Sequence, residues 1–405
     1  MRSTTNAKLF TAGDGEDAFN VLHVWGTPYE VGVAQGTILK QEVTEFIDIV
    51  YQYIVDQIDE ALNSTKPGEL VPHWLLDDVA EFGIDAALDL EIAATRVWTP
   101  IHFLEEIRGL ADATGMPYQQ IERIHLLGEL TKGGCSLLSA YKDAVAPGYK
   151  QIGLRALDWS ELPFTSYAQV TVYHPEGQWG PSGPGHAFAN VGFTGFIGSF
   201  NAMSSIGTYS QEIGVTFPDS TFGYESRFGI PFTYLLRDLV QFDETIADAQ
   251  TRIAESKRTC YLILGFGAVD TPASAGEPFM EIEYSAEVAK FMNSANLEPD
   301  TSWHPRIPDV VWNAMDWLCP NYAIPMHAQI EAGYGALTPE VIIENVTAIV
   351  ETGSTFISIY AYETSGESYL YQAYGRAADE SGPDPAYLRR FTKLSASALW
   401  AETKP

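Results

Sequence analysis

The chain has few cysteines and few of the spacings that bind metals or build disulfide frameworks. Only Cys135, Cys260 and Cys319 occur among its 405 residues, and its eight histidines are scattered. Without a Cys-x-x-Cys or His-x-x-x-His spacing, a metal centre or a disulfide scaffold is not expected. We therefore predict no metal and no cofactor. If one disulfide forms, it would join Cys260 to Cys319, because Cys135 has the more reactive context.

Basic residues are also scarce. There are 23 Lys and Arg against 53 Asp and Glu, which gives a formal net charge of −30. Such a surface repels phosphate backbones and anionic membranes. We therefore expect no nucleic-acid partner. The acidity itself indicates solubility, or life in an acidic or salty medium.

Long apolar runs are missing. No stretch approaches the roughly 18–20 apolar residues of a membrane span, so we expect no integral membrane segment. Residues 1–15 are polar and do not form a secretory signal as written. The expected compartment depends on the source: lysosomal or secreted for a eukaryotic protein with a trimmed signal, and cytoplasmic otherwise. The sequence leaves a homo-oligomer open.

The first third of the chain reads as helical after one short strand. With 46% hydrophobic residues the chain has ample material for a large core, and it shows no internal repeat. Apolar residues at helical spacing predict helices. The predicted strand is 21–25, and the predicted helices are 29–62, with possible breaks, 74–94, 101–114 with Gly115 as C-cap, and 118–130.

From Cys135 onward, short runs rich in β-branched and aromatic residues dominate, which is typical of strands. The predicted strands are 136–140, 151–158, 168–174, 188–193, 207–216, 260–265, 279–284, 288–292, 355–361 and 369–374. Helices are expected at 231–256, 338–350 and 385–402. Helices segregated from a large antiparallel strand set indicate an α+β fold, with two sheets between helices.

Cys135 is the strongest candidate for a nucleophile. It follows Gly133 and Gly134 where the helical third ends. A thiol is a weak nucleophile until it becomes a thiolate beside a base. If Cys135 begins a chain, its own α-amine, with an ordinary pKa near roughly 8, can take the thiol proton. The Gly134–Cys135 bond would have to break, and the glycine pair permits the strained backbone that a cut needs. The alternative is a buried structural cysteine in a loop.

Arg155 and Asp158 lie in the next predicted strand, Gly153-Leu154-Arg155-Ala156-Leu157-Asp158-Trp159. This strand would return as a hairpin beside the one that starts at Cys135. The cation would stabilise the thiolate, and the carboxylate would hold the α-amine. Residues three apart on a strand face opposite ways, so both would reach one thiol only through a bend or bulge. The alternative is a surface ion pair or two unrelated charges.

A cysteine followed by this Arg-x-x-Asp resembles the cysteine N-terminal-nucleophile (Ntn) hydrolases. These include acyl-coenzyme A:6-aminopenicillanate acyltransferases, penicillin V acylases, bile-salt hydrolases and acid ceramidases. The likeness is strongest to the acyltransferase branch, and it extends over about residues 21 to 240. Three further stretches carry it: Gly26-Thr27-Pro28-Tyr29-Glu30-Val31-Gly32 with Gln35-Gly36, Glu105-Glu106-Ile107-Arg108-Gly109-Leu110-Ala111 with Thr114-Gly115, and Gly192-Phe193-Thr194-Gly195-Phe196-Ile197-Gly198.

The resemblance implies a four-layer α-β-β-α sandwich, the Ntn-hydrolase fold. Residues 1–134 would form an N-terminal helical segment, either a pro-segment or an α chain. Residues 135–405 would form the β-rich catalytic chain, packed with it as one globular unit. The implied activity is hydrolysis of a linear amide in a small N-acyl substrate through a thioester on Cys135, after self-cleavage between Gly134 and Cys135. The alternatives are acyl transfer to an amine and a non-catalytic binding protein on the same fold.

The oxyanion donors are where the sequence departs from the pattern. Many relatives carry Gly-Met-Asn-x-x-Gly after the third stretch, and the asparagine helps to form the oxyanion hole. Here Ser204 stands in its place, and Asn201 is the alternative donor. A second asparagine comes later in several relatives, for which Asn293 and Asn296 are the candidates. An oxyanion donor is worth roughly 3–4 kcal/mol of barrier, so its identity matters for rate.

Arg227 is the candidate for a substrate-binding cation. It ends the tract Phe222-Gly223-Tyr224-Glu225-Ser226-Arg227, which precedes a predicted helix and could line a pocket. A structural ion pair with an acidic neighbour is the stronger alternative for this arginine.

Overall fold

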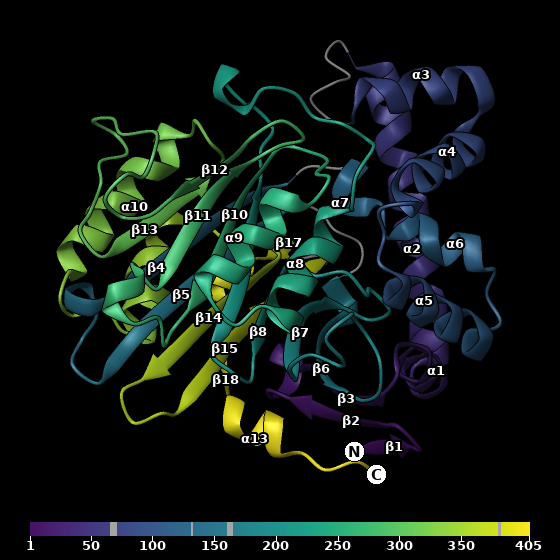
Figure 1. The fold of residues 1–405 in the computed structure, drawn as a ribbon, viewed down its shortest axis with the longest axis horizontal. Helices are drawn as coiled ribbons and strands as arrows, with labels where there is room; N and C mark the ends of the chain where they lie inside the picture. Colours follow the sequence, from purple (N-terminus) through teal and green to yellow (C-terminus); the bar gives the residue numbers. More distant parts are fainter. Residues whose placement is uncertain (65–70, 131–132, 160–164, 380–381) are drawn as a thin grey trace.

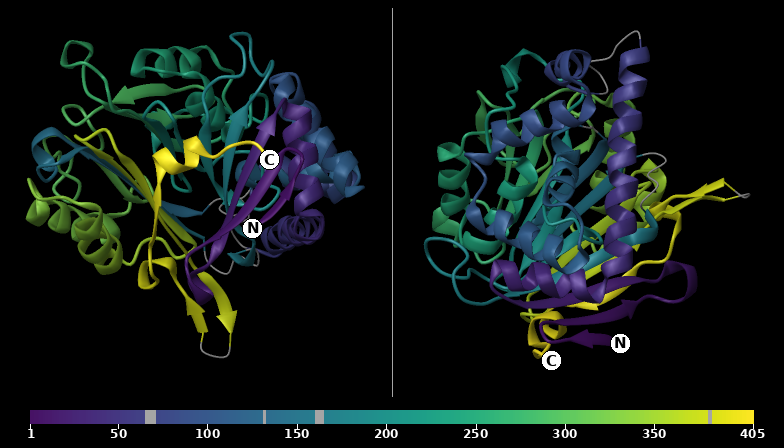
Figure 2. Two further views of the ribbon diagram at one scale, coloured as in Figure 1. Left: turned by 90° about the horizontal axis from the view of Figure 1, so that it is seen from below. Right: turned by 90° about the vertical axis from the view of Figure 1, so that its right-hand side faces the viewer.

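Two β-sheets pack face to face, and helices cover their outer surfaces (Figure 1). This computed structural model describes residues 1–64, 71–130, 133–159, 165–379 and 382–405. Its four layers, α-β-β-α, confirm the predicted α+β class and the sandwich. The two chain termini lie at the same end of the molecule, where Lys8 Nζ approaches Glu402 Oε1 at 2.7 Å (Figures 1 and 2).

The first sheet has ten strands, all antiparallel to their neighbours except for the parallel pair β3 and β6. In spatial order they are β1 (Arg2–Thr4), β2 (Ala7–Ala12), β3 (Phe19–Gly26), β6 (Ala168–Pro175), β7 (Phe188–Phe193), β8 (Asn201–Ser204), β9 (Thr208–Gly214), β10 (Leu262–Ala268), β11 (Phe279–Tyr284) and β12 (Ala289–Met292).

The second sheet has six strands, and a small ribbon stands beside it. In spatial order the six are β13 (Val310–Met315), β4 (Gly134–Tyr141), β5 (Tyr149–Asp158), β14 (Phe356–Glu363), β15 (Ser368–Tyr374) and β18 (Thr392–Ser395), and the ribbon is β16 (Arg376–Asp379) with β17 (Gly382–Asp384). The space between the sheets is filled by aromatic and polar side chains. Tyr209 of β9, for example, reaches Ser139 of β4, with 2.7 Å between the two hydroxyl oxygens.

Helices from three parts of the chain form the outer layers. The ten-stranded sheet is covered by α8 (Phe232–Phe242), α9 (Ile246–Glu255) and α1 (Pro28–Ile38). The six-stranded sheet is covered by α10 (Pro320–Gly333), α11 (Pro339–Val341), a π-helix (Ile342–Thr347) and α12 (Ala348–Val350). Figure 2 shows these two layers on opposite sides of the sheets. The short α13 (Ala396–Ala401) closes the chain.

The N-terminal helices form one bundle beside the ten-stranded sheet (Figure 1). They are α1, α2 (Lys40–Asn63), α3 (His73–Phe82), α4 (Ile84–Arg96), α5 (Ile101–Thr114), α6 (Tyr118–Ile124) and α7 (Leu127–Leu130). In the described part of the chain, no helix is both long and apolar enough to cross a membrane.

Glycines let α1 and α5 meet backbone to backbone. A Cβ on Gly32 would lie 2.1 Å from the carbonyl oxygen of Glu106, and one on Gly109 would lie 2.1 Å from that of Tyr29. Any larger residue at either position would push the helices apart. Both glycines belong to the stretches that carry the family resemblance, so this packing gives those stretches a structural role.

Several predicted elements need correction. The helix expected at 74–94 is broken by Gly83, whose φ of 86° ends α3 before α4 begins. The helix expected at 385–402 is mostly absent: a 3₁₀ turn at Ala386–Leu388 leads into β18, and only α13 is helical. The N-terminal segment is also not purely helical, because β1, β2 and β3 belong to the ten-stranded sheet. Gly115 is confirmed as the C-cap of the 101–114 helix, with an αL backbone.

Buried ion pairs join the N-terminal segment to the rest of the molecule. Arg237 Nη2 of α8 lies 2.7 Å from Glu106 Oε2 of α5, and both side chains are buried. His102 Nε2 of α5 lies 2.9 Å from Asp238 Oδ1 of α8. Burial strengthens such contacts but leaves a costly charge if one partner is lost. The two segments are therefore fixed against each other by more than the chain connection.

Glu281 gives the core a predictable response to pH. Burial between the sheets raises its pKa to about 8, and Asn313 Nδ2 donates to Oε1 at 2.7 Å. A folded-state pKa above the unfolded value stabilises the fold at low pH, and this contribution is lost as the pH rises through about 8. We expect the free energy of unfolding to fall by on the order of a few kcal/mol between about pH 5 and about pH 9, and Glu281→Gln to flatten that fall. Urea denaturation checks this, with the exposed Glu367→Gln as control. An equally steep fall in Glu281→Gln would contradict the assignment.

Candidate active site

The β4–β5 hairpin holds Cys135 and Arg155 on one face. Cys135 pairs with Leu157 and Leu137 pairs with Arg155, so the cysteine and the arginine are diagonal neighbours across the two strands. Arg155 Nη2 donates to Cys135 Sγ at 3.3 Å. Both side chains are buried, with 2% and 0% of their surface exposed. The hairpin predicted from the sequence is confirmed, and it brings the thiol and the guanidinium into contact.

Glu212, a residue that the sequence did not single out, shares the guanidinium with Cys135. Its carboxylate accepts from Arg155 Nη2, and its carbonyl oxygen accepts from Arg155 Nε at 3.4 Å. Burial raises the pKa of the Cys135 thiol well above its usual range, Arg155 lowers it and Glu212 raises it further. Because burial disfavours a charged thiolate and Glu212 offsets the effect of Arg155, this arrangement favours the neutral thiol.

Asp158 lies on the other face of the hairpin. Its Oδ2 accepts from Thr352 Oγ1 at 2.6 Å, and its Oδ1 accepts from the backbone N–H groups of Gly353 and Ser354 at 2.8 and 2.9 Å. The register between β4 and β5 is regular, so the bulge that would turn Asp158 toward the thiol is absent. Asp158 does pair with Gly134, and so it lies beside the bond that would have to break.

A small cavity of about 20 Å³ lies against Cys135, with room for roughly one water molecule. Its lining includes Gly128 and Gly133 of the N-terminal segment, Phe232 of α8 and Cys260. The thiol is therefore enclosed, and part of its cover comes from the residues just before the Gly134–Cys135 bond. Gly214 lines the cavity as well, and its backbone N–H lowers the pKa of the thiol.

Neither Asn201 nor Ser204 lines this cavity. Asn201 is buried between the sheets, and its Nδ2 donates to the Tyr360 hydroxyl. Ser204 closes the β8–β9 turn: its Oγ lies 2.7 Å from Thr208 Oγ1 and accepts from the Thr208 N–H at 3.1 Å. The structure thus gives Ser204 a turn-closing role and does not bring it to the sulfur.

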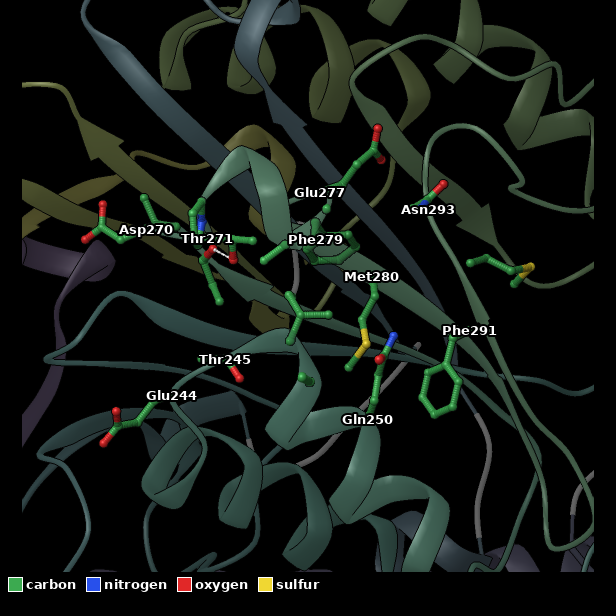
Figure 3. Close-up of a pocket in the computed structure, with 18 of the residues that line it drawn as sticks. Glu244, Thr245, Gln250, Asp270, Thr271, Glu277, Phe279, Met280, Phe291 and Asn293 are labelled. Atoms are coloured by element: carbon green, nitrogen blue, oxygen red, sulfur yellow. Dashed lines mark hydrogen bonds between the residues drawn. The ribbon is translucent and has the colours of Figure 1, made fainter.

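Asn293 and Asn296 lie at the edge of the ten-stranded sheet, away from Cys135. The Asn296 side chain accepts from the Asn293 N–H at 2.7 Å, so the pair forms a turn after β12. Asn293 lines a separate pocket that shares no residue with the cavity at Cys135 (Figure 3). Neither asparagine is within reach of an oxyanion on the thiol in this structure.

Arg227 forms a structural ion pair, which the sequence analysis gave as the alternative to substrate binding. Its Nη1 contacts the Asp78 carboxylate and lies 3.0 Å from Glu91 Oε1, which ties the loop before α8 to α3 and α4. It is not among the residues around Cys135.

The disulfide suggested for Cys260 and Cys319 is absent, since all three cysteines are free. Among the described residues, no three His, Cys, Asp or Glu side chains gather to hold a metal ion.

Glu212 and Gly214 are thus candidate site residues that the sequence analysis missed. The only local signal was a run of polar residues, Ser210-Gln211-Glu212, inside a predicted buried strand. A buried charge normally needs a partner, so such a run predicts a cation across the core. The sequence does not say that the partner is Arg155, because β9 and β5 lie in different sheets.

Solved structures with a similar chain path include two acylases. A Caenorhabditis elegans N-acylethanolamine-hydrolyzing acid amidase ortholog has a TM-score of 0.41 at 11% identity, over 56% of this chain and 92% of that one. Penicillin V acylase from Agrobacterium tumefaciens has a TM-score of 0.42 at 10% identity, over 66% of this chain and 89% of that one. Likenesses at this level assign no activity to the chain.

Sequence relatives are closer and span the whole chain. No protein-family model matches. Protein dcd1A of Dictyostelium discoideum is 33% identical over 420 residues, which cover 99% of this chain and 90% of that protein. Protein dcd1B of the same organism is 30% identical over 418 residues, which cover 100% of this chain and 79% of that protein. The chain therefore belongs to the family of the Dictyostelium proteins dcd1A and dcd1B.

Proposed function

We propose that this protein is a cysteine amidohydrolase that cuts its own chain between Gly134 and Cys135 and then hydrolyses a linear N-acyl amide. The observation that carries the proposal is the 3.3 Å contact between the Cys135 sulfur and the Arg155 guanidinium in a buried hairpin. A cation at this distance stabilises a thiolate. Gly133, which lies just before the proposed cut, also lines the cavity at the thiol.

The cut supplies the base that the site otherwise lacks. Among the described residues that line the cavity there is no histidine. Cleavage would give Cys135 a free α-amine, which could take the thiol proton and become an ammonium group. Asp158, which pairs with Gly134 across the hairpin, is the carboxylate that we propose to receive that ammonium. Residues 1–134 would then form the α chain, held by its buried ion pairs, and residues 135–405 the catalytic chain.

Turnover would proceed through a thioester. The Cys135 sulfur attacks the amide carbonyl, the amine leaves with the proton from the Cys135 ammonium, and water releases the acyl group as a carboxylic acid. Gly214 lines the cavity at the sulfur, so we propose its backbone N–H as the first oxyanion donor. Asn201 donates to the Tyr360 hydroxyl and would need to leave it to contribute.

The acyl acceptor decides between hydrolase and acyltransferase. The same thioester can pass to water or to a second amine, and the acyltransferase-like stretches of the sequence keep both open. A fluorogenic N-acyl amide, offered with and without a primary amine, tests the proposed function. Release of free acid at the same rate in both samples supports the hydrolase, and a new amide product supports the transferase. No turnover of acyl amides by cut protein would sink the proposal.

Asp158→Asn tests the role given to that carboxylate. The amide keeps the size of the side chain but loses the charge that would hold the Cys135 ammonium. We expect cutting and turnover to slow by on the order of 10²-fold, while the fold loses about 1–3 kcal/mol from the bonds to the 352–354 turn. Mass spectrometry follows the cut, and urea denaturation follows the fold. Asp243→Asn, which removes a buried carboxylate bonded to Arg252, is the matched control and should be cut normally.

A non-catalytic binding protein on the same fold is the second candidate. It is favoured by one feature: no asparagine side chain lines the cavity at Cys135 among the described residues. It predicts an uncut chain with a Cys135 thiol that does not react with alkylating reagents. The two candidates therefore differ in a single experiment on the purified protein.

A further inference from the structure

A second and much larger pocket opens at the other end of the strands that carry the Cys135 site. Its volume is about 420 Å³, within the range of roughly 300–1,000 Å³ that small-molecule sites occupy. Cys135 lies beside Gly214 and Leu262, at one end of β9 and β10, whereas this pocket includes Ala268, at the far end of β10. No residue lines both spaces, so the pocket is separate from the proposed catalytic site.

One side of the pocket is apolar. Met280 of β11 and Phe291 of β12 point into it beneath the first turns of α9 (Figure 3). Met280 belongs to the core and Phe291 packs against it, so this wall is held in place from behind. Gln250 of α9 lies next to both side chains and has no hydrogen-bond partner among the described residues (Figure 3). Its amide is thus free to bond a ligand.

The other side of the pocket is acidic. Glu244 and Asp270 both lie on the side away from Phe291, apart from each other and with Thr245 and Thr271 between them in the view (Figure 3). Their side chains are 68% and 75% exposed, and their partners, His186 at 3.6 Å and Lys150 at 2.8 Å, form surface pairs that hold little energy. None of the described residues that line the pocket carries a positive charge. Carboxylates and phosphates are therefore disfavoured ligands, and cations are favoured ones.

We propose that this pocket binds a protonated organic amine with a hydrophobic body. The body would lie on Met280 and Phe291, and the ammonium group would lie on the side of the pocket that carries Glu244 and Asp270. The site does not depend on the chemistry of Cys135, and it extends beyond the proposed amidohydrolase function. Its two ends match the two ends of such a molecule, which is what gives the pocket its selectivity.

Calorimetric titration of the full-length chain with phenylbutylamine tests the ligand class, with phenylbutanol and phenylbutyrate as its neutral and anionic counterparts. We expect the amine to bind at least about tenfold more tightly than the carboxylate at low salt, and the alcohol to fall between them. Cys135→Ala protein should bind the amine as well as the wild type does. Absence of amine binding, or equal binding of all three compounds, would overturn the proposal.

Two pairs of variants locate the binding. Ala247, an exposed lining residue on α9, can be changed to Trp to fill the pocket, and the exposed Ala254→Trp on the same helix is its control. Ala247→Trp should lower the affinity for the amine by at least about tenfold, and Ala254→Trp should leave that affinity unchanged. Glu244→Gln with Asp270→Asn should erase the preference for amine over alcohol, whereas Glu255→Gln should keep it. Unchanged affinity in Ala247→Trp would place the amine elsewhere and refute the site.

Discussion

Cys135→Ala protein is expected to remain one intact chain and to hydrolyse no acyl amide. Removal of the nucleophile takes away both the sulfur that cuts the chain and the sulfur that forms the thioester. In other hydrolases loss of the nucleophile lowers kcat by about 10⁶-fold, and we expect a loss of that order here. Intact mass follows the cut, and a fluorogenic amide follows turnover.

Cys260→Ala is the matched control for this experiment. Cys260 is buried and lines the same small cavity, but Arg155 does not contact it. We expect the Cys260→Ala chain to be cut and active. If Cys135→Ala protein were still cut, or if both variants lost activity alike, the nucleophile would have to be sought elsewhere.

Arg155→Met is expected to produce the largest loss of stability among the variants considered. The substitution leaves the Glu212 carboxylate buried without its cation, and the cost of such an orphaned charge is about 3–5 kcal/mol. The remaining thiol should also react more slowly with alkylating reagents, because the cation that favours the thiolate is gone. Urea denaturation measures the first effect, and the rate of Cys135 alkylation in mildly destabilising urea measures the second.

A double-mutant cycle separates the ion pair from simple loss of packing. Adding Glu212→Gln to Arg155→Met should restore a large part of the lost free energy of unfolding, since neither buried charge then remains. Arg108→Met is the control arginine: its side chain is 54% exposed and that of its partner Glu105 is 34% exposed, so we expect a loss of only about 1 kcal/mol. A double variant as unstable as Arg155→Met alone would show that Glu212 is not the partner that matters.

The sequence predicted most of the fold wherever the local pattern was strong. The β4–β5 hairpin, the 101–114 helix with its Gly115 cap and the strands 188–193 and 279–284 all follow from apolar periodicity and turn residues. In each of these elements the local preference and the tertiary environment favour the same conformation. The layer order then follows, because one-sided apolar strands and helices must cover each other.

The elements that were missed have weak or misleading local signals. β8, Asn201–Ser204, is only four residues long and carries two polar side chains. α10 begins at Pro320 and contains Pro325, which argue against a helix that tertiary packing nevertheless maintains. The last predicted helix fails because Thr392–Ser395 pairs with β15, and a strand partner of that kind is invisible in the sequence.

The sequence predicted the contact that lies within one hairpin, but it did not predict the contacts that cross the core between the two sheets. Cys135 and Arg155 are joined by one hairpin, so their contact follows from register alone. The oxyanion candidates were chosen from their positions in a family motif. In the structure Ser204 closes the β8–β9 turn, and Asn293 lines a pocket away from Cys135. Glu212 reaches Arg155 from the opposite sheet, and only the packing of the two sheets reveals that contact.

The central claim is that Cys135 becomes the first residue of a new chain. Its most direct test is N-terminal sequencing, combined with intact mass, of the purified protein after incubation at acidic and at neutral pH. We predict two fragments that meet at the Gly134–Cys135 bond, with the larger one beginning Cys-Ser-Leu-Leu. An intact chain under both conditions, with a Cys135 thiol that resists labelling even in mild denaturant, would contradict the account and favour the binding protein.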